Sequence, residues 1–521
     1  MRIGIDVGGT NTDAVLMDGA KVLSWHKAPT SPDVTTGITA GVNELMKEAK
    51  VNPADVQAVM IGTTHFANAV VERQRLSPVA AIRLGLPATD ALPPLCDWPD
   101  ELVEAMGGEV FLVKGGYEFD GREISPLDEA EIRRIGQRIR GSAIRAAAVS
   151  CVFSPVNGAM EQRAAEILRA ECPDLLVTCS SEIGRVGLLE RENAAILNAA
   201  LRNLATHLVG GFRQALRDLG LTAPFFFTQN DGTLMAADFA EQFPVLTFSS
   251  GPTNSMRGAA FLSGILDGIV VDIGGTTTDV GVLVAGFPRP AAAVVSVGGV
   301  RTNFRMPDVL SIGLGGGSLV QREPLKIGPR SVGYQLTEKA RVFGGDTLTT
   351  TDIIVAAGRY ALGDAARVAD LDPAFVQAAV QRMQEMVAAA IDAVKTSAAP
   401  VPVIVVGGGS ILVGDEVPGA SQVIKPPYFQ VANAIGAAIA QVGGEVDRIY
   451  STEGTTREAV LNRARTEAVE KAVAAGADPG SVAIVDLEEV PLAYLPGNAV
   501  RVQVKAVGEL KAQLIGNGGR R

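Results

Sequence analysis

Residues 3–14 read IGIDVGGTNTDA, and residues 269–280 read IVVDIGGTTTDV. In each stretch an apolar strand ends in an aspartate, Asp6 or Asp272, and x-Gly-Gly-Thr-x-Thr-Asp follows. One Gly-Gly turn alone would be weak evidence, because hairpins use Gly-Gly freely. Two copies of an eight-position pattern, 266 residues apart, indicate an internal duplication. The sequence therefore predicts two related halves, each with this strand and loop.

The glycines in the two loops are suited to contact with a phosphate. A backbone that passes within hydrogen-bonding distance of a phosphate cannot carry side chains at the point of approach. Successive N–H groups of such a turn form an anion-binding nest, and a threonine hydroxyl adds a donor. The residues predicted to bind the phosphates are Gly8, Gly9, Thr10 and Asn11 in the first copy, and Gly274, Gly275, Thr276 and Thr277 in the second.

Asp6 and Asp272 are predicted to face each other across a cleft. Carboxylate oxygens suit Mg²⁺, directly or through its waters, and a carboxylate can also orient a nucleophile. We therefore predict that both aspartates are catalytic and metal-binding. The alternative is that they only cap turns.

A third glycine loop follows a helix and a strand. The apolar spacing within residues 371–400 predicts a helix that begins after Asp372, an N-cap residue. An apolar strand over 403–406 comes next, and then Gly407, Gly408 and Gly409. Helix, strand and glycine loop in this order are typical of a loop against a ligand. These three glycines are predicted to pass under an adenosine.

The stretch 62–68, GTTHFAN, reads as a strand-to-helix turn. Free N–H groups at a helix start suit an anion or a carbonyl oxygen. Thr63 and Thr64 are therefore candidate substrate-binding residues, with helix capping as the alternative. His65 is a candidate catalytic residue that polarises the substrate or transfers a proton, and the alternative is a packed or capping histidine.

Asn230 and Asp231 follow the aromatic run 225–227. This pattern predicts a strand and then a turn. The two residues either bind the substrate or only close a hairpin.

Composition limits the partners of the chain. It has 521 residues, 47% of them hydrophobic and 20% charged, and a net charge of −11. Nucleic-acid binding needs Lys and Arg to neutralise phosphates, so this balance argues against it. Asp6 lies where a signal peptide would need apolar residues, and prolines and glycines break the longest uncharged stretch, 396–414. We expect a cytoplasmic protein that contacts neither nucleic acid nor membrane.

Paired Asp-x-Gly-Gly-Thr loops and a late Gly-Gly-Gly resemble the actin, sugar-kinase and chaperone ATPase superfamily. More narrowly, the chain is similar to the hydantoinase A/5-oxoprolinase family. One departure is Asn11, where family members commonly carry phenylalanine. The matching segments are 5–16, 62–73, 190–201, 228–235 (TQNDGTLM), 249–259 (SSGPTNSMRGA), 271–283, 311–319 (SIGLGGGSL), 327–334 and 405–412.

The resemblance implies an α/β fold in which two actin/sugar-kinase-like ATPase domains close on a nucleotide cleft. The expected cofactors are ATP and Mg²⁺. The expected domains are residues 1–185 with the first phosphate loop, 186–480 with the second phosphate loop and the adenosine loop, and a small β-rich appendage and tail over 481–521.

The implied function is an ATP-dependent amidohydrolase, or the ATP-binding subunit of one. ATP would phosphorylate the carbonyl oxygen of a hydantoin, lactam or 5-oxoproline, and water would then open the ring, releasing ADP and phosphate. Expected partners are the small cyclic amide, a second hydantoinase B-type subunit and further copies of the chain. The alternatives are a small-molecule kinase of the same superfamily and an ATP-gated binding protein that is not an enzyme.

Overall fold

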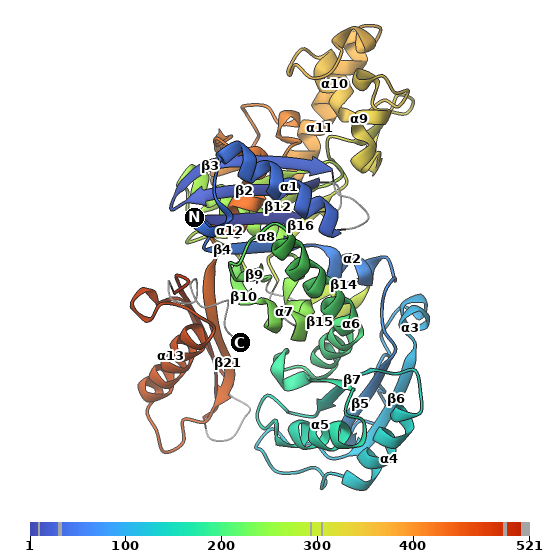
Figure 1. Ribbon diagram of the computed structural model, residues 1–521, viewed down its shortest axis with the longest axis vertical. Helices are drawn as coiled ribbons and strands as arrows, with labels where there is room; N and C mark the ends of the chain where they lie inside the picture. Colours follow the sequence, from blue (N-terminus) through green and yellow to red (C-terminus); the bar gives the residue numbers. More distant parts are fainter. Residues whose placement is uncertain (9–10, 30–33, 292–293, 304–305, 493–497, 512–521) are drawn as a thin grey trace.

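Three large sheets and two short hairpin sheets form the framework of the part of the chain that the computed structural model describes, residues 1–8, 11–29, 34–291, 294–303, 306–492 and 498–511. The hairpin sheets pair β14 (Val295–Val297) with β15 (Val300–Thr302), and β17 (Ser318–Gln321) with β18 (Lys326–Ser331). Figure 1 shows an elongated molecule with lobes at both ends.

The first sheet has nine strands in the order β22-β23-β21-β10-β9-β4-β1-β2-β3. β2 pairs antiparallel with β1, and β4 pairs parallel with it on the other side. The strands are β1 (Arg2–Val7), β2 (Asn11–Asp18), β3 (Lys21–Pro29), β4 (Ala58–Thr63), β9 (Phe225–Thr228), β10 (Thr233–Ala236), β21 (Gln441–Tyr450), β22 (Ala483–Pro491) and β23 (Val500–Gly508).

The second sheet repeats the central order of the first. Its strands run β13-β12-β11-β19-β20, with β16 also paired to β12. As in the first sheet, the glycine-loop hairpin (β11 and β12) is antiparallel, and the next strand inward, β19, is parallel to β11. The predicted duplication is confirmed. The strands are β11 (Gly268–Ile273), β12 (Thr278–Val284), β13 (Phe287–Pro288), β16 (Val309–Ile312), β19 (Val401–Val406) and β20 (Ala420–Ile424).

A four-stranded parallel sheet is inserted after the first glycine-loop unit. Its order is β6-β5-β7-β8, and with α4 and α5 it forms the lower right lobe of Figure 1. Its strands are β5 (Val79–Leu86), β6 (Gly108–Lys114), β7 (Ala146–Cys151) and β8 (Leu176–Cys179).

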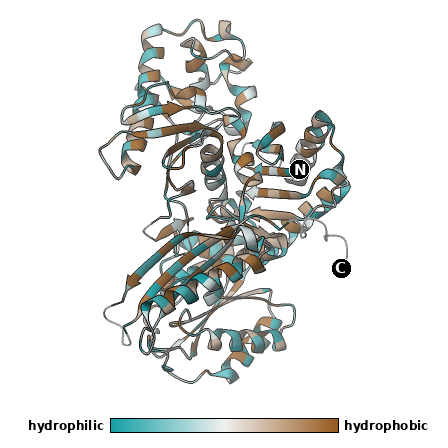
Figure 2. Cartoon of the chain, turned by 90° about the vertical axis from the view of Figure 1, so that its left-hand side faces the viewer, coloured by the Kyte–Doolittle hydropathy of each residue, from teal (hydrophilic) through white to brown (hydrophobic). Residues whose placement is uncertain are grey.

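Helices cover the sheets and separate them. The bounds are α1 (Val34–Ala49), α2 (His65–Val71), α3 (Asp100–Met106), α4 (Glu129–Arg140), α5 (Ala159–Glu171), α6 (Leu188–Asp218), α7 (Ala237–Gln242), α8 (Ser250–Ser263), α9 (Leu336–Lys339), α10 (Thr350–Ala356), α11 (Pro373–Val394), α12 (Ala432–Ala438) and α13 (Arg457–Ala474). The predicted helix after Asp372 is confirmed as α11, and the Asp372 side chain accepts from Phe375 N–H. Apolar strand residues lie in the middle of the sheets in Figure 2.

Helices α8 and α12 lie between the two sheets. On α8, Met256 and Ala260 pack against the second sheet, and on α12, Ile435 and Ala438 pack against the first. The helices approach each other very closely, because a Cβ on Gly258 would lie 1.9 Å from the Ala432 carbonyl oxygen. The two halves therefore meet at this helix pair.

The sheets divide the chain at places other than the predicted domain limits. Strands β9, β10 and β21, which fall within the predicted second domain, belong to the first sheet. β22 and β23, expected in a small appendage, extend that same sheet through antiparallel pairing with β21. β21 pairs with β10 on one side and with β23 on the other, so it joins β22 and β23 to the first sheet. Local sequence patterns carry no signal for pairing between strands so far apart in the chain. The domain limits drawn from the sequence stay a prediction.

Candidate functional site

Four aspartates lie where the two glycine-loop hairpins begin, Asp6 and Asp13 buried and Asp272 and Asp279 partly buried. Asp6 lies opposite Asp13 in the β1–β2 register, and Asp272 lies opposite Asp279 in the β11–β12 register. Lys27 Nζ lies 2.5 Å from Asp13 Oδ1. The predicted partners Asp6 and Asp272 are close enough for their charges to interact. The structure thus brings both halves of the repeat to one place.

Three carboxylates of this cluster, Asp6, Asp272 and Asp279, resist ionisation. Burial raises the pKa of Asp6 to about 6, and the neighbouring charges of Asp13 and Asp272 add to the rise. Burial likewise raises the pKa of Asp279 to about 6, again with Asp272 adding to it. Burial also raises the pKa of Asp272. Carboxylates this close and this buried favour a cation beside them.

Two adjacent residues of α8 contact the two halves. Asn254 Nδ2 donates to Asp6 Oδ1 at 3.4 Å and to Thr228 Oγ1 at 3.0 Å. The next residue, Ser255, donates its hydroxyl to Asp272. Asn254 Oδ1 is buried and has no hydrogen-bond partner among the described residues, so it is a further oxygen available to a cation.

Helix α12 adds a second amide to the cluster. Asn433 Nδ2 donates to Asp6 Oδ2 at 3.0 Å and to Asp13 Oδ2 at 2.8 Å. The sequence analysis assigned no role to Asn254, Ser255 or Asn433. The segment SSGPTNSMRGA contains the first two and was a usable signal, whereas we find none for Asn433.

The second phosphate loop has three of its carbonyl groups engaged, and two of its amides, those of Gly275 and Thr276, donate to no described residue. The loop 313–318 packs against it so closely that a Cβ on Gly315 would lie 2.5 Å from Thr276 N. Within the described part of the chain, the N–H groups of Gly275 and Thr276 donate no hydrogen bond. This leaves a nest of free donors for an anion. The loop carbonyls of Ile273, Gly274 and Gly275 accept from Gly409, Gly316 and Gly317 at 2.7, 3.0 and 2.7 Å.

The first phosphate loop closes with the same turn. Gly8 N donates to Asn11 O at 3.0 Å, and Gly274 N donates to Thr277 O at 2.9 Å. Asn11 is the first residue of β2. The predicted phosphate ligands Gly9 and Thr10 lie outside the described residues.

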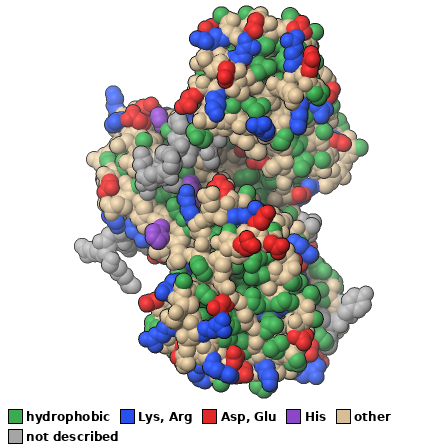
Figure 3. Space-filling model, turned by 90° about the vertical axis from the view of Figure 1, so that its right-hand side faces the viewer, with side chains coloured by type: hydrophobic (Ala, Val, Ile, Leu, Met, Phe, Trp, Pro, Cys, Tyr) green, Lys and Arg blue, Asp and Glu red, His purple; other side chains and the backbone are tan. Residues whose placement is uncertain are grey.

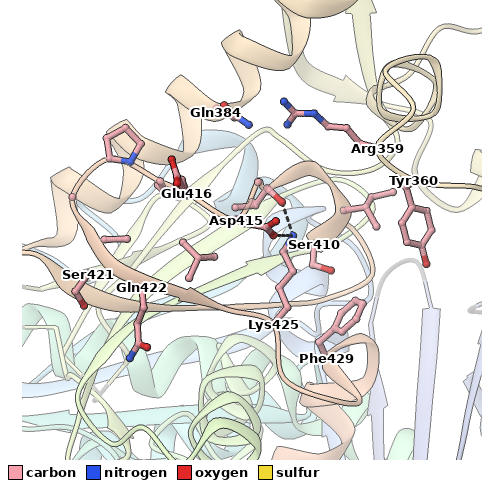
Figure 4. Close-up of a pocket in the computed structure, with 18 residues that line it drawn as sticks. Arg359, Tyr360, Gln384, Ser410, Asp415, Glu416, Ser421, Gln422, Lys425 and Phe429 are labelled. Carbon is pink, nitrogen blue, oxygen red and sulfur yellow. Dashed lines mark hydrogen bonds and ion pairs between the residues drawn. The ribbon is translucent and has the colours of Figure 1, made fainter.

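Gly407, Gly408 and Gly409 lie beside the second loop, as Gly409 N bonding to Ile273 O shows. A Cβ on Gly407 would lie 2.3 Å from Asp272 Oδ1, so only glycine fits there. A cavity of about 1210 Å³ opens directly after this loop, lined by residues 410–411, 413–423, 425 and 429 and by Arg359, Tyr360 and Gln384. Figure 4 shows Arg359 and Gln384 on one side of it, with Ser410 and Lys425 on the other.

The structure places the strand-to-helix turn at 62–68 beside the first aspartate. β4 ends at Thr63 and α2 begins at His65, and Gly62 lies opposite Asp6 in the sheet. Thr63 Oγ1 lies 2.8 Å from His65 Nδ1. Burial lowers the pKa of His65 to about 4, so the ring is neutral at pH 7. Thr64 sits at the N-cap position without a side-chain capping bond.

Asn230 and Asp231 lie in the turn that joins β9 to β10, so they do close a hairpin. Asp231 is engaged within the protein, since Lys505 Nζ lies 2.9 Å from Oδ2 and Thr233 Oγ1 donates to Oδ1 at 2.7 Å. Burial favours the neutral acid, but Lys505 and the Thr233 bonds together lower the pKa of Asp231. Asn230 Nδ2 is buried without a hydrogen-bond partner in the described chain.

The described residues contain neither a three-ligand metal cluster nor a membrane-spanning helix. No group of three or more His, Cys, Asp and Glu side chains there is arranged to hold a metal ion. No described helix has the length and apolar character needed to cross a bilayer.

On the face drawn in Figure 3, acidic and basic side chains are interspersed, and the surface is hollowed between the upper lobe and the body.

Fold and site together define a duplicated α/β protein whose two glycine-loop hairpins meet at one acidic cluster. The chain belongs to the hydantoinase/oxoprolinase family. Residues 2–172 match the family's N-terminal region, and residues 191–364 match the hydantoinase/oxoprolinase model.

Two characterised relatives are subunits of enzymes. The chain is 29% identical to caprolactamase subunit alpha of Pseudomonas jessenii, over 70% of this chain and 55% of that protein. It is 27% identical to the acetophenone carboxylase gamma subunit of Aromatoleum aromaticum, over 68% of this chain and 53% of that protein. The chain thus spans about half the length of the curated relatives it matches.

Two solved structures share the fold. The ATP-dependent caprolactamase from P. jessenii superposes with a TM-score of 0.78 at 21% identity, over 98% of this chain and 88% of that chain. Nucleotide-free acetone carboxylase superposes with a TM-score of 0.71 at 18% identity, over the same shares. The predicted family and fold class are confirmed.

Proposed function

We propose that this chain is an ATP-dependent amidohydrolase, or the ATP-binding subunit of one, that opens a cyclic amide by phosphorylating its carbonyl oxygen. The observation that carries the proposal is the meeting of Asp6 and Asp272 through the adjacent residues Asn254 and Ser255. Similarity to an ATP-dependent caprolactamase supports it.

The nucleotide would lie between the two hairpins. The free N–H groups of Gly275 and Thr276 would donate to phosphate oxygens, and the first loop would contact the same phosphates from the other half. Adenosine would enter the cavity beyond Gly407–Gly409, whose lining carries the aromatic rings of Tyr360 and Phe429 and equal numbers of cationic and acidic side chains. The position of the cavity supports this orientation, because Gly409 N donates to Ile273 O and so joins the cavity's loop to the second phosphate loop.

Two carboxylates and one amide oxygen of this cluster would hold a magnesium ion with water completing its coordination, because no three acidic, His or Cys side chains of the described residues are grouped to hold a metal. Asp6, Asp272 and the unpartnered Asn254 Oδ1 supply the hard oxygens that Mg²⁺ prefers. Bound there, the ion would neutralise charge that develops during phosphoryl transfer.

The chemistry overcomes the poor reactivity of an amide. The carbonyl oxygen attacks the γ-phosphorus, and the bond from that phosphorus to the ADP oxygen breaks. Water adds to the activated carbon, the C–N bond breaks to give an acyl phosphate, and a second water releases the acid and phosphate. Neutral His65 would hold the Thr63 hydroxyl in place beside the first phosphate loop. Thr64 N–H, which contacts Val7 O at 3.3 Å, fixes this turn beside the first loop.

A second candidate is the ketone-activating subunit of a carboxylase, which the similarity to acetophenone carboxylase favours. Because the named relatives are subunits, we also propose a hydantoinase B-type partner. We further propose that the chain assembles into homo-oligomers and that it is located in the cytoplasm. Size-exclusion chromatography of the chain, alone and co-expressed with such a partner, tests both forms of assembly.

The test is phosphate release with Mg·ATP across hydantoins, lactams, 5-oxoproline and ketones with bicarbonate. Stimulation that Asp6→Asn and Asp272→Asn each abolish supports the proposal. The control is Asp238→Asn, since Asp238 is 89% exposed at the surface. Stimulation that survives both changes contradicts it. Phosphate retained on the organic product identifies a kinase, and slow turnover that no compound stimulates identifies a binding protein.

A further inference from the structure

A second cavity, of about 590 Å³, lies between the far end of the first sheet and the edge of the second. β22 and β23 line it from one side, and β13 with the residues after it from the other. Its apolar wall includes Phe287, Pro290, Met306 and Leu487. A cavity of this size with an apolar wall and a few polar groups is the usual form of a small-molecule site.

The cations that line this cavity are already neutralised. Each has a carboxylate partner: Arg185 with Asp447 at 2.9 Å, Arg289 with Asp308 at 2.6 Å, Arg501 with Asp447 at 2.7 Å, and Lys505 with Asp231 at 2.9 Å. An anionic ligand would therefore have to compete with an internal carboxylate. The charges on the lining favour a neutral ligand.

One polar group of the lining has no partner. Asn230 is 4% exposed, and its Nδ2 finds no acceptor among the described residues. Its backbone is fixed on both sides, because its N–H donates to Leu246 O at 2.7 Å and its carbonyl accepts from Thr253 Oγ1 at 3.0 Å. A buried amide donor without an acceptor is costly, and a carbonyl oxygen of a ligand would satisfy it.

Asn230 also lies near the phosphoryl-transfer site. Phe227, three residues earlier, lies opposite Ile61 of β4, and Ile61 lies opposite Ile5, the residue before Asp6. Neighbouring strands are about 4.8 Å apart and Asn230 lies a further two residues along the strand direction than Asp6, so the two residues are roughly 12 Å apart. Thr253, which holds the Asn230 carbonyl, is followed directly by Asn254, the partner of Asp6.

We propose that this cavity receives the acceptor of the reaction, that the acceptor is a neutral cyclic amide, and that Asn230 Nδ2 donates to one of its carbonyl oxygens. The inference rests on the proposed function and narrows its substrate class. It also gives different roles to the two candidate substrate-binding residues of the β9–β10 turn. Asn230 would bind the ligand, whereas Asp231 would hold Lys505 in the lining of the cavity.

The ligand class is tested with two probes that share one ring. 2-Pyrrolidinone and 5-oxoproline differ only by a carboxylate, and their binding to the nucleotide-free protein is measured by saturation-transfer NMR and calorimetry. We expect 5-oxoproline to bind no more tightly than 2-pyrrolidinone. Binding of 5-oxoproline more than tenfold tighter, or no binding of 2-pyrrolidinone, hydantoin or caprolactam, overturns the inference.

The site is tested with Asn230→Asp, which keeps the shape of the side chain and removes the donor. We expect about tenfold weaker binding of the neutral amide, as the loss of one hydrogen bond implies, and unchanged binding of a fluorescent ATP analogue. The matched control is Asn462→Asp, on the exposed helix α13, where Oδ1 accepts from Arg465. Equal amide binding by wild type and Asn230→Asp overturns the assignment.

A second variant guards against misfolding. Val485 lines the cavity and is 38% exposed, so Val485→Trp fills the space from a tolerant position. It should also weaken amide binding at least tenfold and leave the ATP analogue bound, and undiminished amide binding overturns the site. Because these readouts need no ATP hydrolysis, they separate failure of this site from failure of the proposed function.

Discussion

Replacing Gly258 by alanine should separate helices α8 and α12 and disable the site. The added Cβ would lie 1.9 Å from the Ala432 carbonyl oxygen, about 1.5 Å short of an ordinary 3.4 Å contact. The obstacle is backbone, so it cannot rotate away. Overpacking of this kind costs about 1–3 kcal/mol in the free energy of unfolding. Asn254 lies one helical turn before Gly258 and Asn433 directly follows Ala432, so the shift also moves both amides that hold Asp6.

A misplacement of about 1 Å can reduce a rate about 100-fold, and we expect a loss of that order in substrate-stimulated phosphate release. The matched control is Gly210→Ala, within α6, where an added Cβ meets nothing within 4 Å. That change should raise stability by up to about 1 kcal/mol, because alanine favours the helix. Thermal melting and phosphate release are measured on all three proteins. A Gly258→Ala protein that melts and turns over like wild type would refute the role of the helix contact.

Three further predictions concern buried charges. The nucleotide-free protein in EDTA should lose stability as the pH rises from about 4 to 6. The reason is that the pKa of Asp6 is raised to about 6 in the folded protein, so the folded chain holds this proton more tightly than the unfolded chain does. Thermal melts should show a smaller loss of stability for Asp6→Asn. The His65 ring should titrate at about 4 by NMR, readily assigned among three histidines, and a midpoint near 6.5 would contradict its burial. Glu192→Gln should lower the free energy of unfolding by about 3–5 kcal/mol, and with it the melting temperature, because it leaves the fully buried Arg83 without a carboxylate partner. An unchanged melting temperature would show that another group neutralises the Arg83 charge.

The duplicated motif could be predicted because its information is local. Each copy contains strand, glycine turn and strand within about a dozen residues, and the structure gives both the same register, Asp6 opposite Asp13 and Asp272 opposite Asp279. The helix after Asp372 and the turn at 62–68 were predictable for the same reason, since caps and apolar spacing act over a few residues.

The remaining site residues could not be predicted because they come from distant parts of the chain. Asn433 lies 427 residues from Asp6, and Asn254 lies 248 residues from it. Asn433 belongs to no periodic pattern or matching segment, and the segment SSGPTNSMRGA marks Asn254 without assigning it a role. Lys505 likewise reaches Asp231 only because β23 joins the first sheet through β21. Pairing between strands this far apart depends on the whole fold and leaves no local signal.

Helix α8 supplies the geometric link that the repeated loops lack. Twin loops 266 residues apart predict two similar turns, but they do not require the turns to meet. Asn254 and Ser255 are consecutive, so their Cα atoms are about 3.8 Å apart. The Asn254 side chain adds roughly 4 Å and its hydrogen bond 3.4 Å on one side, and the Ser255 side chain adds roughly 2.5 Å and its hydrogen bond about 2.8 Å on the other, which places the carboxylates of Asp6 and Asp272 within roughly 17 Å of each other. The bound holds for any hinge motion that keeps both hydrogen bonds. A motion that separates the two loops must therefore first break the hydrogen bond of Asn254 or that of Ser255. These two hydrogen bonds thus indicate directly whether the cleft is assembled.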